Sequence, residues 1–478
     1  MGETARPQSS AIERLAAWTL AVRAEALPPQ SLERAKLLLL DTLGCGFAAL
    51  GDDVARAVLT TIAAFGEKPQ CTVLGQARKL SPPSAVLANG TLIRVLDLND
   101  YIIGADERSG ARGGHPSDNI PVAVAAAELG RAGGRELLAA IVLGYEIYGR
   151  GKALMPADSV WDGISISGLV APAIAGRLIA LRQDQIADAI ALSVMRAPTP
   201  VAVREGGISA AKSIANALIA QSGMQAALLA AQDVTGPLDL FEAERGLKSV
   251  FAHGIGTAGD IFSAPLATDG LIARVGIKAY PCFAGGQSAI AAALAMHRLL
   301  DGDVGRIAGI RVALADLPIV KRQIVDPGRV DPRSREAADH SLQFLIAVTL
   351  IDGTFGMRQF DNARWHDAEV RALMARLVMT TDPDLTRRAG AAYPCALHVS
   401  GRDGRPYEAE VLAPPGVSPD GLDAKTVLEK FHRVSAEHLA ANARDRIVEA
   451  VMGLDSAPTC DELMQALVPN MRHAGDAR

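Results

Sequence analysis

The stretch AAKSIANALIAQSGMQAALLAAQDV, residues 210–234, constrains the fold of this chain more than any other. Its apolar residues follow the three- and four-residue spacing of a helix, and many of its other residues are small. Such a helix has no broad polar face, so it should be buried on most sides with neighbouring backbones close to it. The stretch therefore predicts a long helix packed tightly among others.

The same helical spacing of apolar residues recurs along most of the chain. It predicts helices over residues 11–27, 31–50, 54–66, 83–98, 120–130, 134–150 and 185–197, and again within 423–451. Aromatic residues make up only 4% of the chain, which suits close-packed helices better than a β-sandwich. The pattern therefore predicts a mainly α fold.

The pattern changes in one segment, from about residue 268 to residue 405. Residues 306–320 alternate as a strand does, and two further strand-like runs within 393–414 flank a turn signal, GRDGRP. Helical stretches separate these runs, so the segment is typical of a small α+β unit. With 478 residues the chain is long enough for several domains, and we expect three parts: helical at 1–267, α+β at 268–405 and helical at 406–478.

Charge and cysteine content limit the classes of protein to which the chain can belong. The net charge is −5 with both signs interspersed, whereas a nucleic-acid-binding protein should carry a concentrated basic face. The five cysteines, an odd number, lack metal-motif spacing, which favours a reduced, cytoplasmic location. No secretory signal and no apolar run long enough to span a bilayer are evident. We therefore expect a cytoplasmic protein with no nucleic-acid and no membrane partner.

No familiar cofactor or metal motif is found in the sequence. It contains no G-x-G-x-x-G after a strand, no phosphate-binding loop, no histidine pair at zinc spacing and no G-x-S-x-G. Its chemistry-bearing residues instead gather in four polar islands within an apolar chain. These are IRVLDLNDY at 93–101, GGHPSDN at 113–119, REGGISAAKS at 204–213 and IKAYPCFAGGQS at 277–288.

Each island also has an ordinary structural interpretation. The aspartates of the first island could cap helix ends or pair with Arg94, and His115 could be a turn residue. Lys278 could discourage pairing at a strand edge, and Lys212 could be solvated. However, Lys212 enters the helix that should be buried, and a buried lysine needs a partner. That partner would be an anionic ligand or one of the aspartates.

Together the islands resemble the MmgE/PrpD family, which includes 2-methylcitrate dehydratases, cis-aconitate decarboxylases and an iminodisuccinate epimerase. The resemblance covers nearly the whole chain. It rests on ANGTLIRVLDLNDY…GGHPSDNIPVAVAAAE, AAKSIANALIAQSGMQAALLAAQDVTGP, IKAYPCFAGGQSAIAAA and ADHSLQFLIAVTLIDG. It implies a large all-helical domain built from both ends of the chain, an inserted smaller α+β lid, and a homodimer. It also implies an active site between domain and lid that needs no metal or organic cofactor.

The resemblance assigns roles to residues of the four islands. It implies the catalytic residues Asp97, His115, Lys212 and Lys278. It implies that Arg94, Asn99, Asp100 and Ser117 bind or orient the substrate. We also predict substrate contacts for Tyr101, Tyr280 and Gln287. In such a site an Asp or His removes a proton next to a carboxylate, and the lysines stabilise the negative charge that develops. Which of Asp97 and His115 is the base stays open.

The chain departs from the family pattern in three places. Tyr101 stands where the family often has Thr, residues 285–287 read Gly-Gly-Gln where it often has His, and Phe344 stands where it often has Tyr. We expect a cofactor-independent hydro-lyase that dehydrates a 2-methylcitrate-like polycarboxylic acid. The alternatives are an epimerase or decarboxylase of a related acid, or a homologue that binds a carboxylate without turnover.

The second island, residues 113–119, is predicted to be an active-site loop. Its two glycines would let the chain turn sharply, and its proline would help to fix the direction of His115. We expect His115 to point into a cleft near Asp97 and Lys212. We also expect Ser117 and Asp118 to cap the helix that follows.

Overall fold

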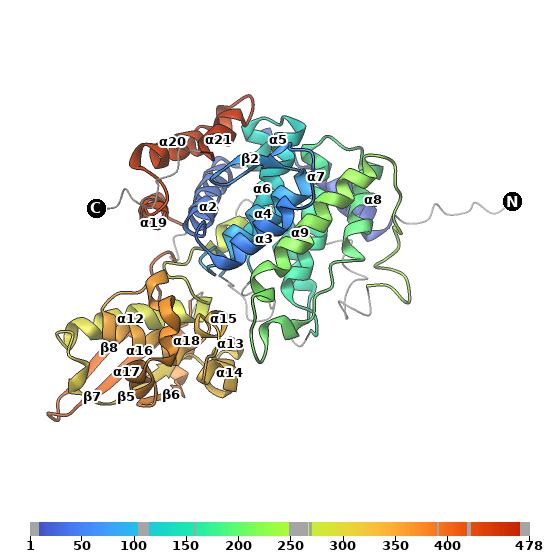
Figure 1. The fold of residues 1–478 in the computed structure, drawn as a ribbon. Helices are drawn as coiled ribbons and strands as arrows, with labels where there is room; N and C mark the ends of the chain where they lie inside the picture. The colour runs from blue at the N-terminus through green and yellow to red at the C-terminus, as the bar shows by residue number, and fades with distance from the viewer. Residues whose placement is uncertain are drawn as a thin grey trace.

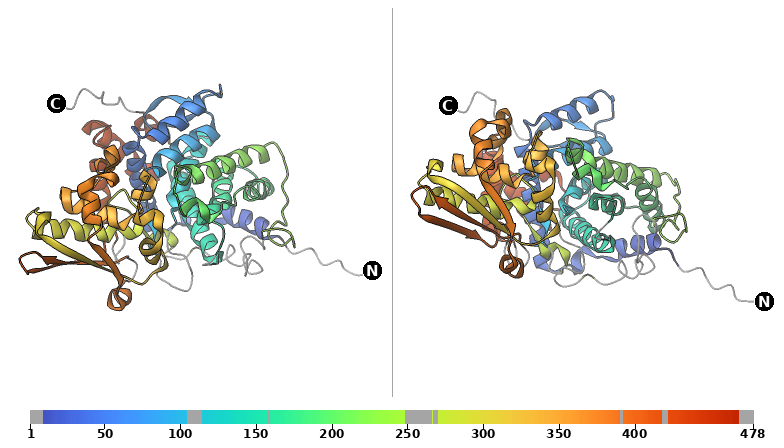
Figure 2. Two further views of the ribbon diagram at one scale, coloured as in Figure 1. Left: turned by 60° about the horizontal axis from the view of Figure 1, so that its bottom comes forward. Right: turned by 90° about the horizontal axis from the view of Figure 1, so that it is seen from below.

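The computed structural model describes residues 9–103, 114–156, 159–247, 266, 270–389, 392–417 and 422–468 (Figure 1). Over these residues the protein is mainly helical, as the sequence predicts, with small sheets. Gly113 and the charged stretch at 104–112 lie outside the described residues. Figures 1 and 2 show a large group of helices beside a smaller unit that contains the main sheet.

The larger group, which we call the helical body, comprises the described helices before residue 275 and after residue 421. Its N-terminal helices are α1 (Ala11–Ala21), α2 (Pro29–Ala48), α3 (Asp53–Ala63), α4 (Pro82–Arg94), α5 (Ile120–Gly130), α6 (Gly134–Leu154), α7 (Ser167–Leu178), α8 (Gln183–Val194) and α9 (Ala211–Ala230). Its C-terminal helices are α19 (Ala424–Ser435), α20 (Ala441–Met452) and α21 (Asp461–Ala466). Short 3-10 helices join them: η1 (Ala24–Ala26), η2 (Pro116–Asn119), η3 (Gly163–Ile166), η4 (Val201–Arg204), η6 (Leu271–Arg274) and η10 (Leu454–Ser456). A short hairpin, β1 (Cys71–Val73) with β2 (Gln76–Leu80), precedes α4.

Helix α9 is the tightly packed helix that the sequence predicts. It packs against α4, α7 and α8. A Cβ added to Gly90 would lie 2.9 Å from the Cβ of Ala217, and one added to Gly223 would lie 2.5 Å from the Cβ of Ala171. Small residues therefore let these backbones approach closely. One stripe of α9 stays open, and Leu218 is exposed there.

The C-terminal helices complete the core of the body. Helix α19 packs along α2, where a Cβ added to Gly44 would lie 3.0 Å from the ring of Phe431. Phe431, Ile447 and Leu463 belong to the same hydrophobic core as the N-terminal helices. Residues from both ends of the chain therefore share one apolar interior.

The smaller unit, which we call the sheet unit, holds the second core, formed mainly by residues 282–417. Its helices are α12 (Gln287–Leu299), α13 (Pro318–Val325), α14 (Pro327–Val330), α15 (Arg335–Ala338), α16 (Leu342–Asp352), α17 (Ala368–Met374) and α18 (Pro383–Arg388). Its 3-10 helices are η7 (Ala284–Gly286), η8 (Val304–Arg306) and η9 (Met357–His366). Its strands are β5 (Ile307–Leu314), β6 (Leu377–Thr381), β7 (Cys395–Gly401) and β8 (Pro406–Val411).

The four strands form one mixed sheet in the order β6-β5-β7-β8. Strands β7 and β8 make the hairpin predicted around GRDGRP, and β5 is the predicted strand within 306–320. Strand β6 was not predicted, and it pairs parallel to β5. Helix α12 packs on β7, β8 and α16. Strand β8 lies after residue 405 but belongs to this sheet, and the next helix begins at Ala424. The division of the chain into domains at residues 267 and 405, and the lid arrangement, stay predictions.

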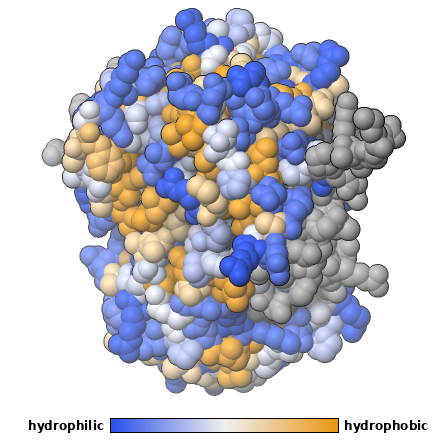
Figure 3. Space-filling view, turned by 90° about the vertical axis from the view of Figure 1, so that its right-hand side faces the viewer, coloured by the Kyte–Doolittle hydropathy of each residue, from blue (hydrophilic) through white to orange (hydrophobic). Residues whose placement is uncertain are grey.

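The surface carries apolar side chains in several separate groups among polar ones, as Figure 3 shows for one face. Among the described helices, none combines the length and apolar character needed to cross a membrane.

Candidate functional site

A two-stranded pairing brings the first and fourth polar islands together. Strand β3 (Tyr101–Ile102) pairs antiparallel with β4 (Val275–Gly276). The turn that precedes β3 holds Asp97 in the left-handed region, with φ of 49°. Lys278 follows β4, and its Nζ donates to the backbone oxygen of Asp97 over 2.9 Å. Lys278 is fully buried, so its interpretation as a strand-edge lysine is wrong.

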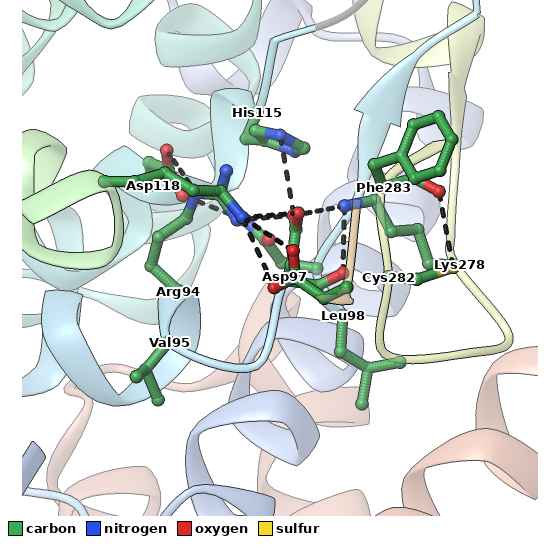
Figure 4. A network of polar contacts seen from close by, with 12 residues as sticks. Arg94, Val95, Asp97, Leu98, His115, Asp118, Lys278, Cys282 and Phe283 are labelled. Carbon is green, nitrogen blue, oxygen red and sulfur yellow. Dashed lines mark hydrogen bonds and ion pairs between the residues drawn. The ribbon is translucent and has the colours of Figure 1, made fainter. Parts of the chain in front are cut away.

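Three basic side chains surround the carboxylate of Asp97. Its Oδ1 lies 2.6 Å from Arg94 Nη1 and 2.5 Å from Lys278 Nζ, and its Oδ2 lies 3.0 Å from Lys212 Nζ. Figure 4 shows Arg94 and Lys278 directed at Asp97. Burial raises the pKa of Asp97, but the three cations outweigh it and hold that pKa well below its ordinary value. Asp97 therefore stays ionised and is a poor proton acceptor.

Lys212 occupies the centre of a second set of contacts. Its Nζ lies 3.4 Å from both carboxylate oxygens of Asp339 and 3.3 Å from Nδ1 of His340. Asp97, Asp339 and His340 are close enough together to hold a metal ion. The ammonium of Lys212 already contacts all three groups, so this donor set is neutralised by a cation of the protein itself. The interpretation of Lys212 as a solvated residue is wrong, because only 2% of it is exposed.

His115 points toward Asp97, as expected from the sequence. Its Nδ1 donates to the backbone oxygen of Asp100 over 2.5 Å, and its Nε2 lies 4.0 Å from Asp97 Oδ1 (Figure 4). The hydrogen bond at Nδ1 leaves the lone pair on Nε2. Burial, with Arg94 and Lys278 nearby, holds the pKa of His115 well below its ordinary value. The imidazole is therefore neutral at neutral pH and carries a lone pair on Nε2, although the same surroundings weaken it as a base.

A second imidazole, His340, lies on the other oxygen of Asp97. Its Nε2 is 3.6 Å from Asp97 Oδ2, and its Nδ1 donates to the carboxylate of Asp339. Its ring stacks on Phe283 with 5.4 Å between centroids. Burial and Lys212 lower the pKa of His340 to about 4. Sequence reasoning missed His340, although Asp339 and His340 directly precede an apolar helix and so form a polar pair beside buried residues.

A buried polar network supports His115 from behind. Ser117 Oγ donates to Asp100 Oδ1 over 2.5 Å. Asn99 Nδ2 donates to Ser117 Oγ over 3.0 Å and to Asp118 Oδ1 over 2.9 Å. Burial raises the pKa of Asp100 to about 7 and that of Asp118 to about 6. The expectation that Ser117 and Asp118 cap α5 is wrong, because both side chains are used in this network and α5 has no side-chain cap.

A cavity of about 290 Å³ opens beside these groups. Five of the predicted site residues line it: Arg94, Asp97, Tyr101, His115 and Lys278. The other predicted residues are absent from its lining: Asn99, Asp100, Ser117, Lys212, Tyr280 and Gln287. Lys212 is joined to the cavity through Asp97, and Asn99, Asp100 and Ser117 support His115.

Gln287 and Tyr280 shape the segment that carries Lys278. The side-chain oxygen of Gln287 accepts from the backbone nitrogens of Ala279 and Tyr280, and its nitrogen donates to the Tyr280 oxygen. Tyr280 packs edge-on against Phe355. This geometry supports a positioning role for Gln287 in place of the predicted contact with substrate.

The cavity lining also contains basic residues that sequence reasoning missed. Its basic side chains are Arg94, Lys152, Arg204, Lys278, Arg322 and Arg329, and its acidic side chains are Asp97 and Asp162. Arg204 stands in the third polar island and the other missed residues stand among charged or polar residues, so no local pattern singles them out, and only the fold brings them together. An excess of cations around a small cavity favours a ligand with several negative charges.

The three departures from the family pattern differ in their position. Tyr101 lines the cavity. Phe344 is buried in the second core, where its ring centroid lies 5.7 Å from that of Phe360. A Cβ added to Gly285 would lie 2.6 Å from the ring of Phe283, so this glycine permits close packing. Only the Tyr101 departure therefore changes the described lining of the cavity.

Comparison with known proteins identifies relatives along the whole chain. The profile of the MmgE/PrpD N-terminal domain matches residues 13–258, and that of the MmgE/PrpD C-terminal domain matches residues 280–455. A cis-aconitate decarboxylase-like protein of Aspergillus oryzae is 23% identical over 96% of this chain and 97% of its own length. Human cis-aconitate decarboxylase is 24% identical over 92% of this chain and 91% of its own length. The 2-methylcitrate dehydratase of Cupriavidus necator is 26% identical over 74% of each chain.

Proposed function

Since the chain belongs to the MmgE/PrpD family, we propose that it is a lyase that removes a proton from a carbon next to a carboxylate of a polycarboxylic acid. The observation that carries this proposal is the position of His115 Nε2 in a small, mainly basic cavity beside Lys278 and Arg94. Dehydratase and decarboxylase relatives support the class of substrate. The protein's own side chains would supply the acid, the base and the charge stabilisation.

The basic side chains meet the main energetic demand of this reaction. A proton on carbon next to a carboxylate is very weakly acidic, because its removal places a second negative charge on that carboxylate. Preorganised cations stabilise such a charge most effectively where water is excluded. Arg94 and Lys278 line the cavity, and Asp97 holds both in place.

We assign the role of base to His115 in preference to Asp97. The three cations around Asp97 favour its ionised form and so weaken it as a proton acceptor. His115 has its Nδ1 engaged by the Asp100 carbonyl and presents Nε2 next to the cavity. A bound polycarboxylate would raise the proton affinity of this imidazole, because negative charge nearby stabilises imidazolium.

We propose dehydration of a 2-methylcitrate-like acid as the reaction. The departing hydroxide must then be protonated. Lys278 suits this step, because burial lowers the pKa of its ammonium and so makes it a stronger acid. Decarboxylation is the second candidate, since human cis-aconitate decarboxylase aligns over more of the chain than the Cupriavidus dehydratase does. Epimerisation would share the first proton transfer.

The test is proton exchange in D2O, followed by NMR, with 2-methylcitrate, citrate and cis-aconitate as separate substrates. We expect deuterium at the carbon next to a carboxylate for at least one acid. Loss of water or release of CO2 then identifies the complete reaction. If the protein binds the acids but exchanges a proton in none of the three, the enzyme proposal is wrong. The protein would then be a homologue that binds a carboxylate without turnover.

We also propose that the protein is a cytoplasmic homodimer that binds neither nucleic acid nor membrane. The five cysteines are unpaired and buried, which suits a reducing compartment. Exposed leucines on α9, Leu218 and Leu229, offer apolar surface to a second copy. Light scattering after size-exclusion chromatography measures the mass in solution, and a monomer at micromolar concentration would contradict the homodimer.

A further inference from the structure

A second group of basic side chains lines the cavity without pairing with Asp97. This second basic group consists of Lys152, Arg204, Arg322 and Arg329. Lys152 and Arg204 come from the helical body, whereas Arg322 and Arg329 come from helices α13 and α14 of the sheet unit. The proposed chemistry at His115 and Lys278 uses none of them, so their presence in the lining needs another explanation.

Arg329 is the most deeply placed member of the group. Only 3% of it is exposed, and its Nη2 donates to the backbone oxygen of Arg204 over 3.0 Å. Its Nε lies 3.4 Å from the carboxylate of Asp326. Burial nevertheless lowers the pKa of this guanidinium to about 10. The protein thus buries a cation in the cavity wall and compensates its charge incompletely.

Arg204 and Lys152 both lie near the carboxylate of Asp162, but only Arg204 is paired with it. Arg204 Nε lies 2.5 Å from Oδ2 of Asp162, while Oδ1 of Asp162 accepts from the backbone of η3. Lys152 Nζ lies over Gly163, where an added Cβ would be 3.0 Å away. Lys152 is not ion-paired with a described carboxylate, and Asp162 acts on it only as a nearby charge. Among the described residues here, positive charge therefore exceeds negative charge.

We infer that Arg204, Arg329 and Lys152 form a subsite for a second, remote carboxylate of the substrate. Guanidinium groups suit this task, because their planar donors match the two oxygens of a carboxylate. The inference rests on the proposed function, in which the ligand is a polycarboxylate with one carboxylate at Arg94 and Lys278. The subsite would make the protein prefer acids with two or more carboxylates to monocarboxylates. It would also join the two units through one ligand, since Arg204 and Arg329 belong to different units.

Calorimetric titration with two unreactive probes tests the subsite. Glutarate carries a carboxylate at each end of a five-carbon chain, and pentanoate is the same chain with only one. We expect wild-type protein to bind glutarate at least tenfold more tightly than pentanoate, as one charge-assisted contact allows. Arg329→Gln should lose most of this preference and bind pentanoate like the wild type. A preference that survives in Arg329→Gln, or an equal loss for both probes, would overturn the subsite.

Two further variants separate recognition from folding. Lys152→Gln removes a cation that is not ion-paired with any described carboxylate, so it should fold normally and also lower the preference. Arg333→Gln is the matched control in the sheet unit, because its side chain is 80% exposed and pairs with Asp331 outside the cavity lining. Arg333→Gln should keep the wild-type preference. If Arg333→Gln loses that preference, the result counts against the subsite.

Binding of these probes requires no turnover, so the two proposals can fail separately. If the preference depends on Arg329 but no acid undergoes exchange in D2O, the subsite stands and the enzyme proposal falls. If exchange occurs and the preference is the same in Arg329→Gln, the enzyme proposal stands and the subsite falls.

Discussion

Asp97 shows how a single carboxylate can organise a site without reacting in it. Its two side-chain oxygens and its backbone oxygen all accept from basic side chains, which come from α4, α9 and the segment after β4. Removal of this carboxylate would leave three buried cations close together and poorly compensated. We therefore interpret Asp97 as the residue that positions the cations, and His115 as the residue that moves the proton.

The variant His115→Gln tests this division of roles. Glutamine can still donate to the Asp100 carbonyl, so the fold and the melting temperature should change little. Without an imidazole the proton transfer should slow by about 100-fold or more, the usual contribution of a general base. Exchange in D2O measures the rate, and His398→Gln on β7, outside the cavity lining, is the control. Wild-type exchange in His115→Gln would remove His115 from the mechanism.

The raised pKa of Asp100 predicts that the free energy of unfolding depends on pH. Burial raises its pKa to about 7, whereas an aspartate in an unfolded chain titrates near 3.9. Between about pH 4 and pH 7 the folded protein keeps a proton that the unfolded chain has lost. The contribution of Asp100 to the free energy of unfolding therefore falls as pH rises through this window, by at most about 1.4 kcal/mol per pH unit.

Asp100→Asn should lack this dependence. The free energy of unfolding of the variant, minus that of the wild type, should rise between pH 4 and pH 7, and urea titrations across this range measure it. A difference that stays constant with pH would show that Asp100 titrates as it does in the unfolded chain.

At the level of elements, the sequence predicts those segments whose pattern is long enough to be recognised. The helical period of α9 and the alternation around the β7–β8 hairpin extend over many residues. Strand β6 shows no such alternation, because its residues are half-buried or exposed on both faces at the edge of the sheet. Strands β3 and β4 have two residues each, too few for any period, although their pairing brings Asp97 and Lys278 together.

The same reasoning explains which site residues were predicted. The residues that contact Asp97 occur in polar islands that stand out within an apolar sequence. Arg204 occurs in one of these islands but was not singled out, and Lys152 and Arg329 lie among other charged or polar residues. Their common position depends on the packing of the sheet unit against the helical body, which no local pattern encodes.

Helix α19 reaches the site through one buried lysine. Lys430 Nζ lies 2.6 Å from Asp41 Oδ1 and donates to the Leu98 carbonyl, next to Asp97, over 2.9 Å. Lys430→Met would leave Asp41 buried and unpaired, which should cost about 3 kcal/mol of stability, and it would free the turn that holds Asp97. Urea denaturation and the exchange rate measure the two effects. Lys425→Met, on the exposed face of the same helix, should change neither.

The double variant Asp41→Asn, Lys430→Met separates the two roles of Lys430. Most of the stability should return, because no buried charge is left without a partner. Activity should stay low, because the Leu98 carbonyl still lacks its donor. If the double variant fully recovers both stability and activity, Lys430 has only a structural role.

For the whole molecule, the shared core of the helical body predicts that the C-terminal helices are indispensable. Val427, Phe431 and Ile447 are fully buried against N-terminal helices. A chain that ends at residue 421 should therefore expose a broad apolar surface and aggregate on expression, whereas the full chain should stay folded. Comparing the yield of soluble protein from the two checks this, and a soluble, cooperatively melting 421-residue chain would contradict it.

The shared core also sets a sequence of events during synthesis on the ribosome. The N-terminal helices emerge first and α2 packs on α4 and α6, but the part of α2 that contacts α19 is not covered until α19 has been made, several hundred residues later. Domains usually fold in the order in which they leave the ribosome. Here part of the apolar surface of the first helices stays exposed until translation is almost finished, because the helices that cover it have not yet been made. The chain should therefore bind a chaperone that covers apolar surface throughout most of its synthesis and release it only when the last helices emerge.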